Sequence, residues 1–129
     1  MRMDNDAPWH AHIYYDANER AAAEKLRQWF EQAVLHIPIL FVGRLVDSPI
    51  GPHPMAQFEI HFPANAKDAV TAAITPTGLR ALIHPLTDDD LADHTSLAQW
   101  IGEPLPLDVS VLDPPGTNQG VARFGKSDF

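Results

Sequence analysis

Two histidines stand two residues apart in the segment at residues 9–15, WHAHIYY. Aromatic and β-branched residues dominate this segment, a composition typical of a β-strand. In a strand, His10 and His12 point to the same face. A neutral imidazole nitrogen binds iron, zinc, copper or nickel, and two histidines at this spacing can share one ion. The motif therefore indicates a metal site on one face of a sheet.

Two further histidines are candidate partners for this pair. His84 ends a second apolar segment and could supply a third ligand from the adjacent strand. His53 stands between Pro52 and Pro54, which restrict the loop and limit the entropy lost when the side chain is fixed. The alternative is that this segment is only a rigid loop.

The remaining histidines are weaker candidates for a functional role. His94 follows Asp93, a carboxylate of the kind that orients a functional imidazole. His61 lies on the polar side of its predicted strand, where it could instead be solvated, and we expect His36 to be structural. A His-x-His pair alone is a weak signal, so the metal hypothesis depends on the strand order that brings the histidines together.

The composition limits the possible chemistry. The chain of 129 residues is 45% hydrophobic and 20% charged, which suits one self-sufficient globular domain. Because there is no cysteine, a metal must be held by histidines and carboxylates. The formal net charge of -8 argues against a nucleic-acid partner. No apolar run approaches a membrane span, and Asp4 and Asp6 do not fit a signal peptide, so we expect a cytoplasmic protein without a membrane partner.

Hydrophobic periodicity predicts alternating strands and helices. Asp16 and Glu19 have the spacing of a capping box, which predicts a helix from residue 17 to about residue 35. A second helix is expected to start at a cap formed by Asn65, and a third, in one or two pieces, to span residue 87 to about residue 102. The expected inner face of the first helix comprises Ala22, Leu26, Trp29, Phe30 and Ala33, and the expected strands are residues 9–15, 39–45, 56–62, 79–84 and 107–112.

This order of elements predicts an α+β fold with a ferredoxin-like antiparallel sheet, both main helices on one face, and an extra C-terminal helix and strand. The first strand would be central, beside the third and fourth. Residues 1–112 would form this single domain, and residues 113–129 a tail. The face opposite the helices must be covered by extra segments or a second subunit, or hold a solvated cleft; it would collect His10, His12, Tyr14, Gln57, Glu59, His61, Arg80, Leu82 and His84.

Three stretches carry a family resemblance: WHAHIYY, GPHPMAQFEIHF and LIHPLTDDDLADHTSLAQWIGEPLPLD. In this order and spacing, from about Trp9 to Val111, the chain resembles the DOPA 4,5-dioxygenase family of fungi and bacteria. The resemblance implies a ferredoxin-like subunit, commonly a homodimer, that opens a catechol ring by extradiol cleavage with O₂. In that family DOPA is cleaved between ring carbons 4 and 5.

The resemblance also implies a cofactor and a set of roles. Non-haem Fe(II) would bind the two catechol oxygens and O₂, and a histidine would take and return a catechol proton. Zinc could occupy the same site in purified samples. The implied roles are metal-binding for His12, His53 and His84, catalytic for His94 and His10, and substrate-binding for Arg44 and Glu59.

Several alternatives remain open at the level of the sequence. His10 is either a fourth ligand or the acid/base, and Arg44 either pairs with a substrate carboxylate or is a surface arginine. Many extradiol enzymes use two histidines and one carboxylate, so Glu59 could replace a histidine on the metal. The true substrate could be another catechol. The rival functions are a zinc-dependent hydrolase and a dimeric module that binds a metal or a small aromatic without oxygenase activity.

Overall fold

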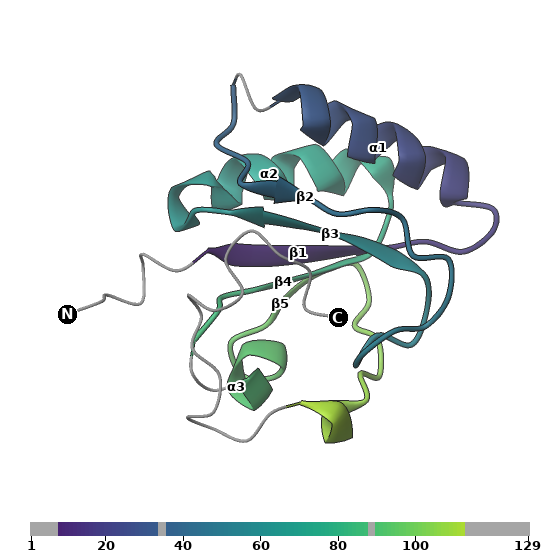
Figure 1. Ribbon diagram of the computed structural model, residues 1–129, viewed down its shortest axis with the longest axis vertical. Helices are drawn as coiled ribbons and strands as arrows, with labels where there is room; N and C mark the ends of the chain where they lie inside the picture. The colour runs from purple at the N-terminus through teal and green to yellow at the C-terminus, as the bar shows by residue number, and fades with distance from the viewer. Residues whose placement is uncertain (1–7, 34–35, 88–89, 113–129) are drawn as a thin grey trace.

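The structure is a computed structural model that describes residues 8–33, 36–87 and 90–112 (Figure 1). The tail expected at residues 113–129 lies outside the described residues. Single 3-10 turns occur at Ala64–Ala66, Thr75–Thr77 and Val109–Val111. The other elements, in chain order, are β1 (Trp9–Tyr14), α1 (Arg20–Ala33), β2 (Phe41–Val42), β3 (Gln57–Phe62), α2 (Lys67–Ile74), β4 (Ala81–His84), α3 (Asp90–His94) and β5 (Gln99–Ile101).

The five strands form one antiparallel sheet in the order β2-β3-β1-β4-β5. β1 is central, between β3 and β4, as expected. In Figure 1, α1 and α2 lie together on one side of the sheet and α3 lies on the other. The α+β class and the ferredoxin-like arrangement are therefore confirmed, with β5 added beside β4.

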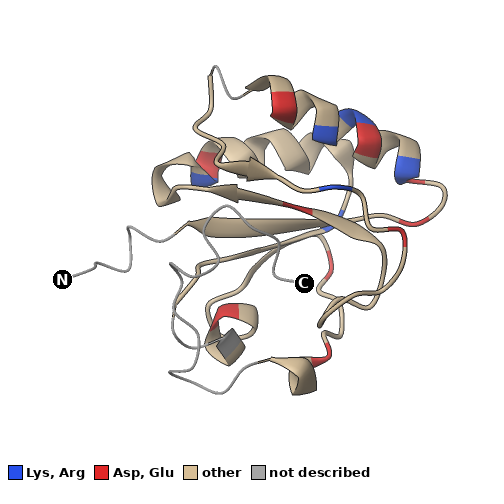
Figure 2. Ribbon diagram, viewed as in Figure 1, with Lys and Arg blue, Asp and Glu red and all other residues tan. Residues whose placement is uncertain are grey.

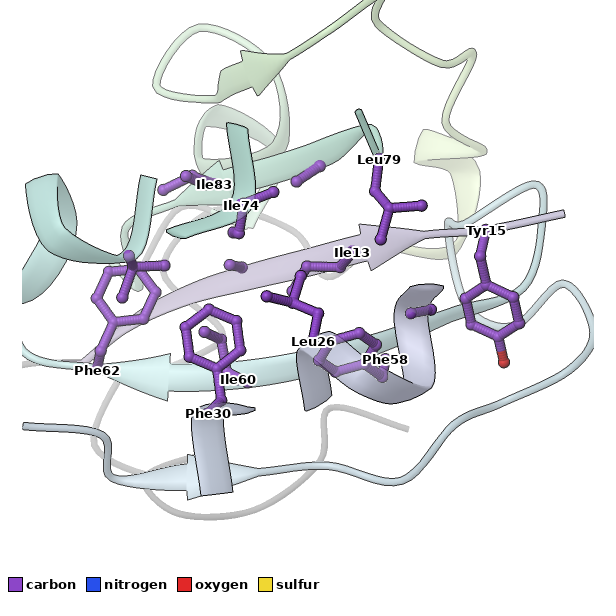
Figure 3. Close-up of a cluster of buried hydrophobic side chains, with 14 of the residues drawn as sticks. Ile13, Tyr15, Leu26, Phe30, Phe58, Ile60, Phe62, Ile74, Leu79 and Ile83 are labelled. Carbon is purple, nitrogen blue, oxygen red and sulfur yellow. The ribbon is translucent and has the colours of Figure 1, made fainter. Parts of the chain in front are cut away.

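The hydrophobic core lies between the sheet and the two long helices (Figure 3). Because side chains alternate along a strand, one set of alternate residues meets the helices and the other set points away from them. The core set includes Ala11, Ile13, Phe58, Ile60, Phe62, Ala81 and Ile83 from the strands, with Ala23, Leu26, Phe30, Val70 and Ile74 from the helices. The same alternation directs the histidines of β1, β3 and β4 to the opposite face.

The first helix begins with the predicted capping box. The backbone N–H of Glu19 donates to Asp16 Oδ1 at 2.9 Å, and the backbone N–H of Asp16 donates to Glu19 Oε1 at 3.0 Å. Figure 2 shows basic and acidic residues interspersed along α1. Two ion pairs join residues four apart on this helix, Arg20–Glu24 and Arg27–Glu31. None of the helices in the described ranges combines the length and the apolarity that crossing a membrane requires.

The inner face of α1 differs in part from the expected one. The buried residues are Ala23, Leu26, Phe30 and Ala33, at spacings of three and four residues. Ala22 and Trp29 are exposed, Trp29 by 46% of its surface. The helical spacing of the apolar residues predicts that both face the core, but each lies one residue from the buried stripe, about 100° around the helix.

The C-terminal elements also differ from expectation. Within the predicted helix at residues 87–102, Gln99–Ile101 forms β5, where Trp100 pairs with Leu82 of β4. Pairing with the edge of the sheet overrides the helical spacing of the apolar residues. Gly102 ends this strand with a φ of 79°, a conformation that favours glycine. The predicted strand at residues 107–112 is wrong: Val109–Val111 is a 3-10 turn, capped by Asp108.

Two smaller predictions also need correction. Asn65 does not cap the second helix: neither the 3-10 turn nor α2 has a side-chain cap, and Pro63 precedes the turn. The strand predicted at residues 39–45 is reduced to Phe41–Val42. Backbone hydrogen bonds still tie this segment to β3, because Gly43 N donates to Glu59 O at 2.7 Å and Val46 N donates to Gln57 O at 2.9 Å.

Candidate metal centre

Six of the seven histidines are buried, and they gather on the sheet face opposite α1 and α2. His10, His12, His61 and His84 are 0% exposed, and the other two are His53 and His94. His36, which we expected to be structural, is exposed. The polar face is therefore buried within this one chain and is not a solvated cleft.

Strand register brings the histidines together. His10 lies opposite His61 of β3 on one side and opposite His84 of β4 on the other. His12 lies opposite Glu59 of β3. The ligand atoms of His10, His12 and His84 all lie within 4.8 Å of one another. The predicted pairing of the His-x-His motif with His84 therefore exists in the structure.

The rings of His12 and His84 face each other through their Nε2 atoms, 3.1 Å apart. His12 Nδ1 is 3.0 Å from Gln57 Oε1, and His84 Nδ1 is 2.7 Å from the backbone oxygen of Pro85. An oxygen of this kind only accepts, so each Nδ1 carries the proton and donates it. Each neutral ring then presents a lone pair at Nε2, and two lone pairs point at each other.

A metal ion bound by both nitrogens would resolve this conflict. Metal–imidazole bonds are about 2.0–2.1 Å long, so two nitrogens that bind one ion at an angle of about 90–110° would lie about 2.8–3.4 Å apart. The observed 3.1 Å separation fits this range. Ligating histidines usually donate their other N–H to a carbonyl or carboxylate, which is what His12 and His84 do here. The donor set therefore fits a first-row transition metal.

His12 is suited to ligation because it is held neutral. Burial lowers the pKa of His12 well below its usual 6.5, and the neighbouring rings of His53, His84 and His10 lower it further. The hydrogen bond to Gln57 acts in the opposite direction. The net effect favours the neutral imidazole, which is the form that binds a metal.

A second group of possible ligands shares His10. Glu59 is 1% exposed, and its Oε2 lies 3.2 Å from His61 Nε2 and 3.7 Å from His10 Nδ1. The ligand atoms of these three residues also lie within 4.8 Å of one another. Glu59 therefore stands beside two histidine rings, where a carboxylate can orient them.

His53 reaches the cluster from the proline-rich loop. The backbone of the loop is held by a pair of hydrogen bonds between His53 and Ile50, of 3.0 and 3.2 Å. The His53 ring lies 4.1 Å from the His12 ring, centroid to centroid, and His53 Nδ1 lies 2.7 Å from the hydroxyl of Tyr14. Burial raises the pKa of Tyr14, so this hydroxyl stays protonated.

His94 reaches the histidine cluster from α3. Its ring centroid is 4.3 Å from that of His84 and 6.5 Å from that of His53. Asp93, the expected orienting carboxylate, is fully buried and accepts hydrogen bonds from the backbone N–H and the hydroxyl of Thr87, at 2.9 and 2.6 Å. These contacts attach α3 to the segment that follows β4 and so place His94 beside the site.

The seven residues given roles from the sequence fall into two groups. His10, His12, His53, His84, His94 and Glu59 are buried in or beside the cluster, whereas Arg44 is exposed on the segment after β2. Sequence reasoning placed Tyr14 and Gln57 on the same face but gave them no role. Their hydrogen bonds to His53 and His12 show that alternation along β1 and β3 was the signal that could have found them.

Two curated proteins are similar in sequence to this chain. The chain is 35% identical over 111 residues to an uncharacterized 21.2 kDa protein of Botryotinia fuckeliana, covering 78% of this chain and 61% of the relative. It is 33% identical over 116 residues to DOPA 4,5-dioxygenase of Amanita muscaria, covering 81% of this chain and 49% of the relative. The chain thus spans less than two thirds of the length of either curated relative.

A solved structure shares the fold. It is a crystal structure of a "putative dioxygenase" from Nostoc punctiforme PCC 73102, with a TM-score of 0.72 and 34% sequence identity, covering 81% of this chain and 90% of that chain. The model of the Dopa 4,5-dioxygenase family matches residues 9–111, which include every histidine of the buried cluster. The chain therefore belongs to the DOPA 4,5-dioxygenase family.

Proposed function

We propose that the protein is a metal-dependent extradiol dioxygenase that opens a catechol ring, DOPA or a related compound, with O₂. The observation that carries the proposal is the pair of Nε2 atoms of His12 and His84, 3.1 Å apart with both Nδ1 protons donated elsewhere. Membership of the family supports an oxygenase activity for a site of this composition.

In this proposal His10, His12 and His84 hold non-haem Fe(II). Their ligand atoms are mutually close, and imidazole is a common ligand of iron in oxygenases. Bound Fe(II) would supply a Lewis-acidic, redox-active centre that accepts catechol oxygens and O₂. His53, expected from the resemblance to be a ligand, is assigned instead to the second coordination sphere, because it is not within the group of mutually close ligand atoms.

Protons are handled by histidines beside the ligands. Opening a catechol ring requires a group that takes a hydroxyl proton from the substrate and later returns it, and a buried imidazole beside the ligands could do both. His94 lies against the His84 ring, and His53 lies against the His12 ring with Tyr14 at its Nδ1. Burial of all these rings excludes water, which strengthens electrostatic interactions within the site.

The experiment that tests the proposal is anaerobic loading with Fe(II), followed by addition of L-DOPA and then air. We expect a yellow product that absorbs to the red of the catechol, formed only with iron and lost in His12→Ala. His36→Ala is the matched control, because His36 is exposed. Bound iron without any coloured product from DOPA or simple catechols would favour a binding module instead. Failure to bind any metal would overturn the site.

The quaternary structure is part of the same proposal. We expect a homodimer, as the family resemblance implies, and sedimentation of the purified chain measures this directly. A dimer at micromolar concentration supports the proposal, and a monomer at the same concentration contradicts it. Because the six buried histidines are covered within one chain, the centre itself would be complete in a monomer.

A further inference from the structure

Gln57 is the first residue of β3, and its side chain is fully buried beside the His12 ring. Its backbone is held on both sides, because Gln57 N donates to Val46 O at 3.1 Å and Val46 N donates to Gln57 O at 2.9 Å. Its Cα lies opposite that of Tyr14 in β1. Strand pairing therefore fixes the point from which the amide reaches His12.

The orientation of the Gln57 amide determines the tautomer of His12. Oε1 lies 3.0 Å from His12 Nδ1, so Nδ1 carries the proton and Nε2 keeps its lone pair. With the amide reversed, its nitrogen would donate to Nδ1, and the proton of His12 would move to Nε2. His12 would then donate an ordinary hydrogen bond to His84 Nε2, 3.1 Å away. That hydrogen bond would fill the position that a metal needs.

A second observation bears on the same amide. Gln57 Nε2 is buried, and no residue in the described part of the chain accepts a hydrogen bond from it. A buried donor without a partner is unfavourable. In the reversed orientation this nitrogen would donate to His12 Nδ1, so the observed orientation retains an unfavourable buried donor at the same time as it leaves His12 Nε2 available. A buried polar group left unpaired in this way is often found at a functional site.

We infer that Gln57 is a positioning residue, which holds His12 in the tautomer that exposes Nε2 to a metal shared with His84. The inference deepens the proposed function, since it rests on the same metal centre. It assigns no chemical step to Gln57. It states that the amide selects between a metal-ready His12 and a His12–His84 hydrogen bond.

The first test reads the tautomer in the metal-free protein by two-bond ¹H–¹⁵N correlation spectra of the histidine rings. We expect the His12 proton on Nδ1 in the wild type and on Nε2 in Gln57→Met, which lacks the acceptor. A wild-type His12 with its proton on Nε2 overturns the inference, as does an unchanged tautomer in Gln57→Met. Thermal unfolding of both proteins confirms that the spectra report folded molecules.

The second test measures the affinity for Co(II) by its visible absorption, without any oxygenase assay. We expect Gln57→Met to bind Co(II) about 10–100-fold more weakly, the usual effect of removing an orienting partner. Gln57→Glu, which can only accept, should bind as tightly as the wild type or more tightly. Equal losses in both variants would show a merely structural role and overturn the inference. Gln99→Met, a strand glutamine exposed on β5, is the control that should not change affinity.

These readouts separate this inference from the proposed function. If Gln57 selects the tautomer but iron-loaded protein never cleaves a catechol, the oxygenase proposal fails and the inference stands. If catechol cleavage occurs while Gln57→Met binds Co(II) like the wild type, the inference fails and the oxygenase proposal stands.

Discussion

The imidazole rings of His10 and His61 lie face to face, with 3.7 Å between ring centroids and 1° between ring planes. Their Cα atoms are directly opposite in the β1–β3 register, so strand pairing produces the stack. Glu59 Oε2 lies beside both rings, nearer to His61 than to His10. One side of the candidate metal centre is thus formed by two stacked rings with a buried carboxylate beside them.

We predict that Glu59 orients these rings rather than replacing a histidine on the metal. Glu59→Gln removes the charge beside His10 and His61, so we expect the Zn(II) affinity to fall about 10–100-fold, less than in His12→Ala. Isothermal titration of both variants measures the difference. Glu103→Gln, an exposed glutamate, should leave the affinity unchanged. A loss in Glu59→Gln as large as that in His12→Ala would make Glu59 a ligand and contradict the prediction.

Metal loading should raise the unfolding temperature of the protein. A ligand that binds only the folded state stabilises it by about 4 kcal/mol at a free concentration of about 1,000 times its Kd. Differential scanning fluorimetry with Zn(II), and again after chelation, measures the reversible shift. His84→Ala should lose most of it, because His84 Nε2 is one of the two facing nitrogens. His36→Ala should keep it, and equal shifts in the two variants would exclude His84 as a ligand.

Two neighbouring tyrosines should differ in their contribution to stability. The Tyr14 hydroxyl lies 2.7 Å from buried His53 Nδ1, whereas the Tyr15 hydroxyl donates to exposed Asp47 at 2.7 Å. We expect Tyr14→Phe to lower the free energy of unfolding by about 1 kcal/mol, and Tyr15→Phe by less, because water can replace the partner of Asp47. Urea denaturation of both variants gives the comparison, and a larger loss in Tyr15→Phe would contradict it.

The lowered pKa of His12 should make the metal-free protein less stable in mild acid. Below its usual pKa of 6.5, His12 is protonated in the unfolded chain but stays neutral in the folded protein, so the unfolded state binds more protons. The free energy of unfolding then falls as the pH decreases below 6.5. This residue contributes at most about 1.4 kcal/mol per pH unit to the fall. Urea denaturation of the wild type and of His12→Gln, above and below pH 6.5, tests this prediction. The wild type should lose more stability than the variant, and parallel pH profiles would refute the assignment.

Two adjacent aromatic residues of α1, Trp29 and Phe30, should differ in their contribution to the stability of the fold. Phe30 is fully buried in the core, whereas Trp29 is 46% exposed and touches the Phe30 ring edge-on. We expect Phe30→Ala to lower the free energy of unfolding by about 3–5 kcal/mol. Trp29→Ala should lower it by about 1 kcal/mol. Chemical denaturation measures both losses, and losses of similar size would support the sequence-based assignment of both residues to the inner face of the helix.

Much of the fold was predictable because local rules agreed with the tertiary structure. The capping box at Asp16 and Glu19 and the alternation in β1 and β3 are local signals, and each appears in the structure as expected. The incorrect predictions concern segments whose structure is determined by tertiary contacts rather than by the local sequence. The spacing of Leu97 and Trp100 suits a helix, yet Trp100 pairs with Leu82 at the edge of the sheet. Trp29 is apolar but lies just outside the stripe that faces the core.

The sequence allowed us to predict which strand and which face of the sheet carry the residues of the site. Alternation placed His10, His12 and His84 on one face, and the inferred strand order made them neighbours. The sequence could not indicate which nitrogen of each ring points inward, because that depends on partners such as Gln57 and the backbone oxygen of Pro85. The sequence also could not indicate which of His10 and His53 joins His12 and His84, and the ligand role of His53 stays a prediction.

The two edges of the sheet are its shortest strands, with two residues in β2 and three in β5. An incoming strand would find few unpaired backbone groups there, so lateral pairing between copies, the first step of many aggregates, has little surface on which to start. The long strands that carry the histidine cluster lie in the middle, already paired on both sides. A second copy of this chain would therefore associate through side-chain surfaces of its helices or loops, and the histidine-bearing strands would stay out of reach of edge-to-edge association.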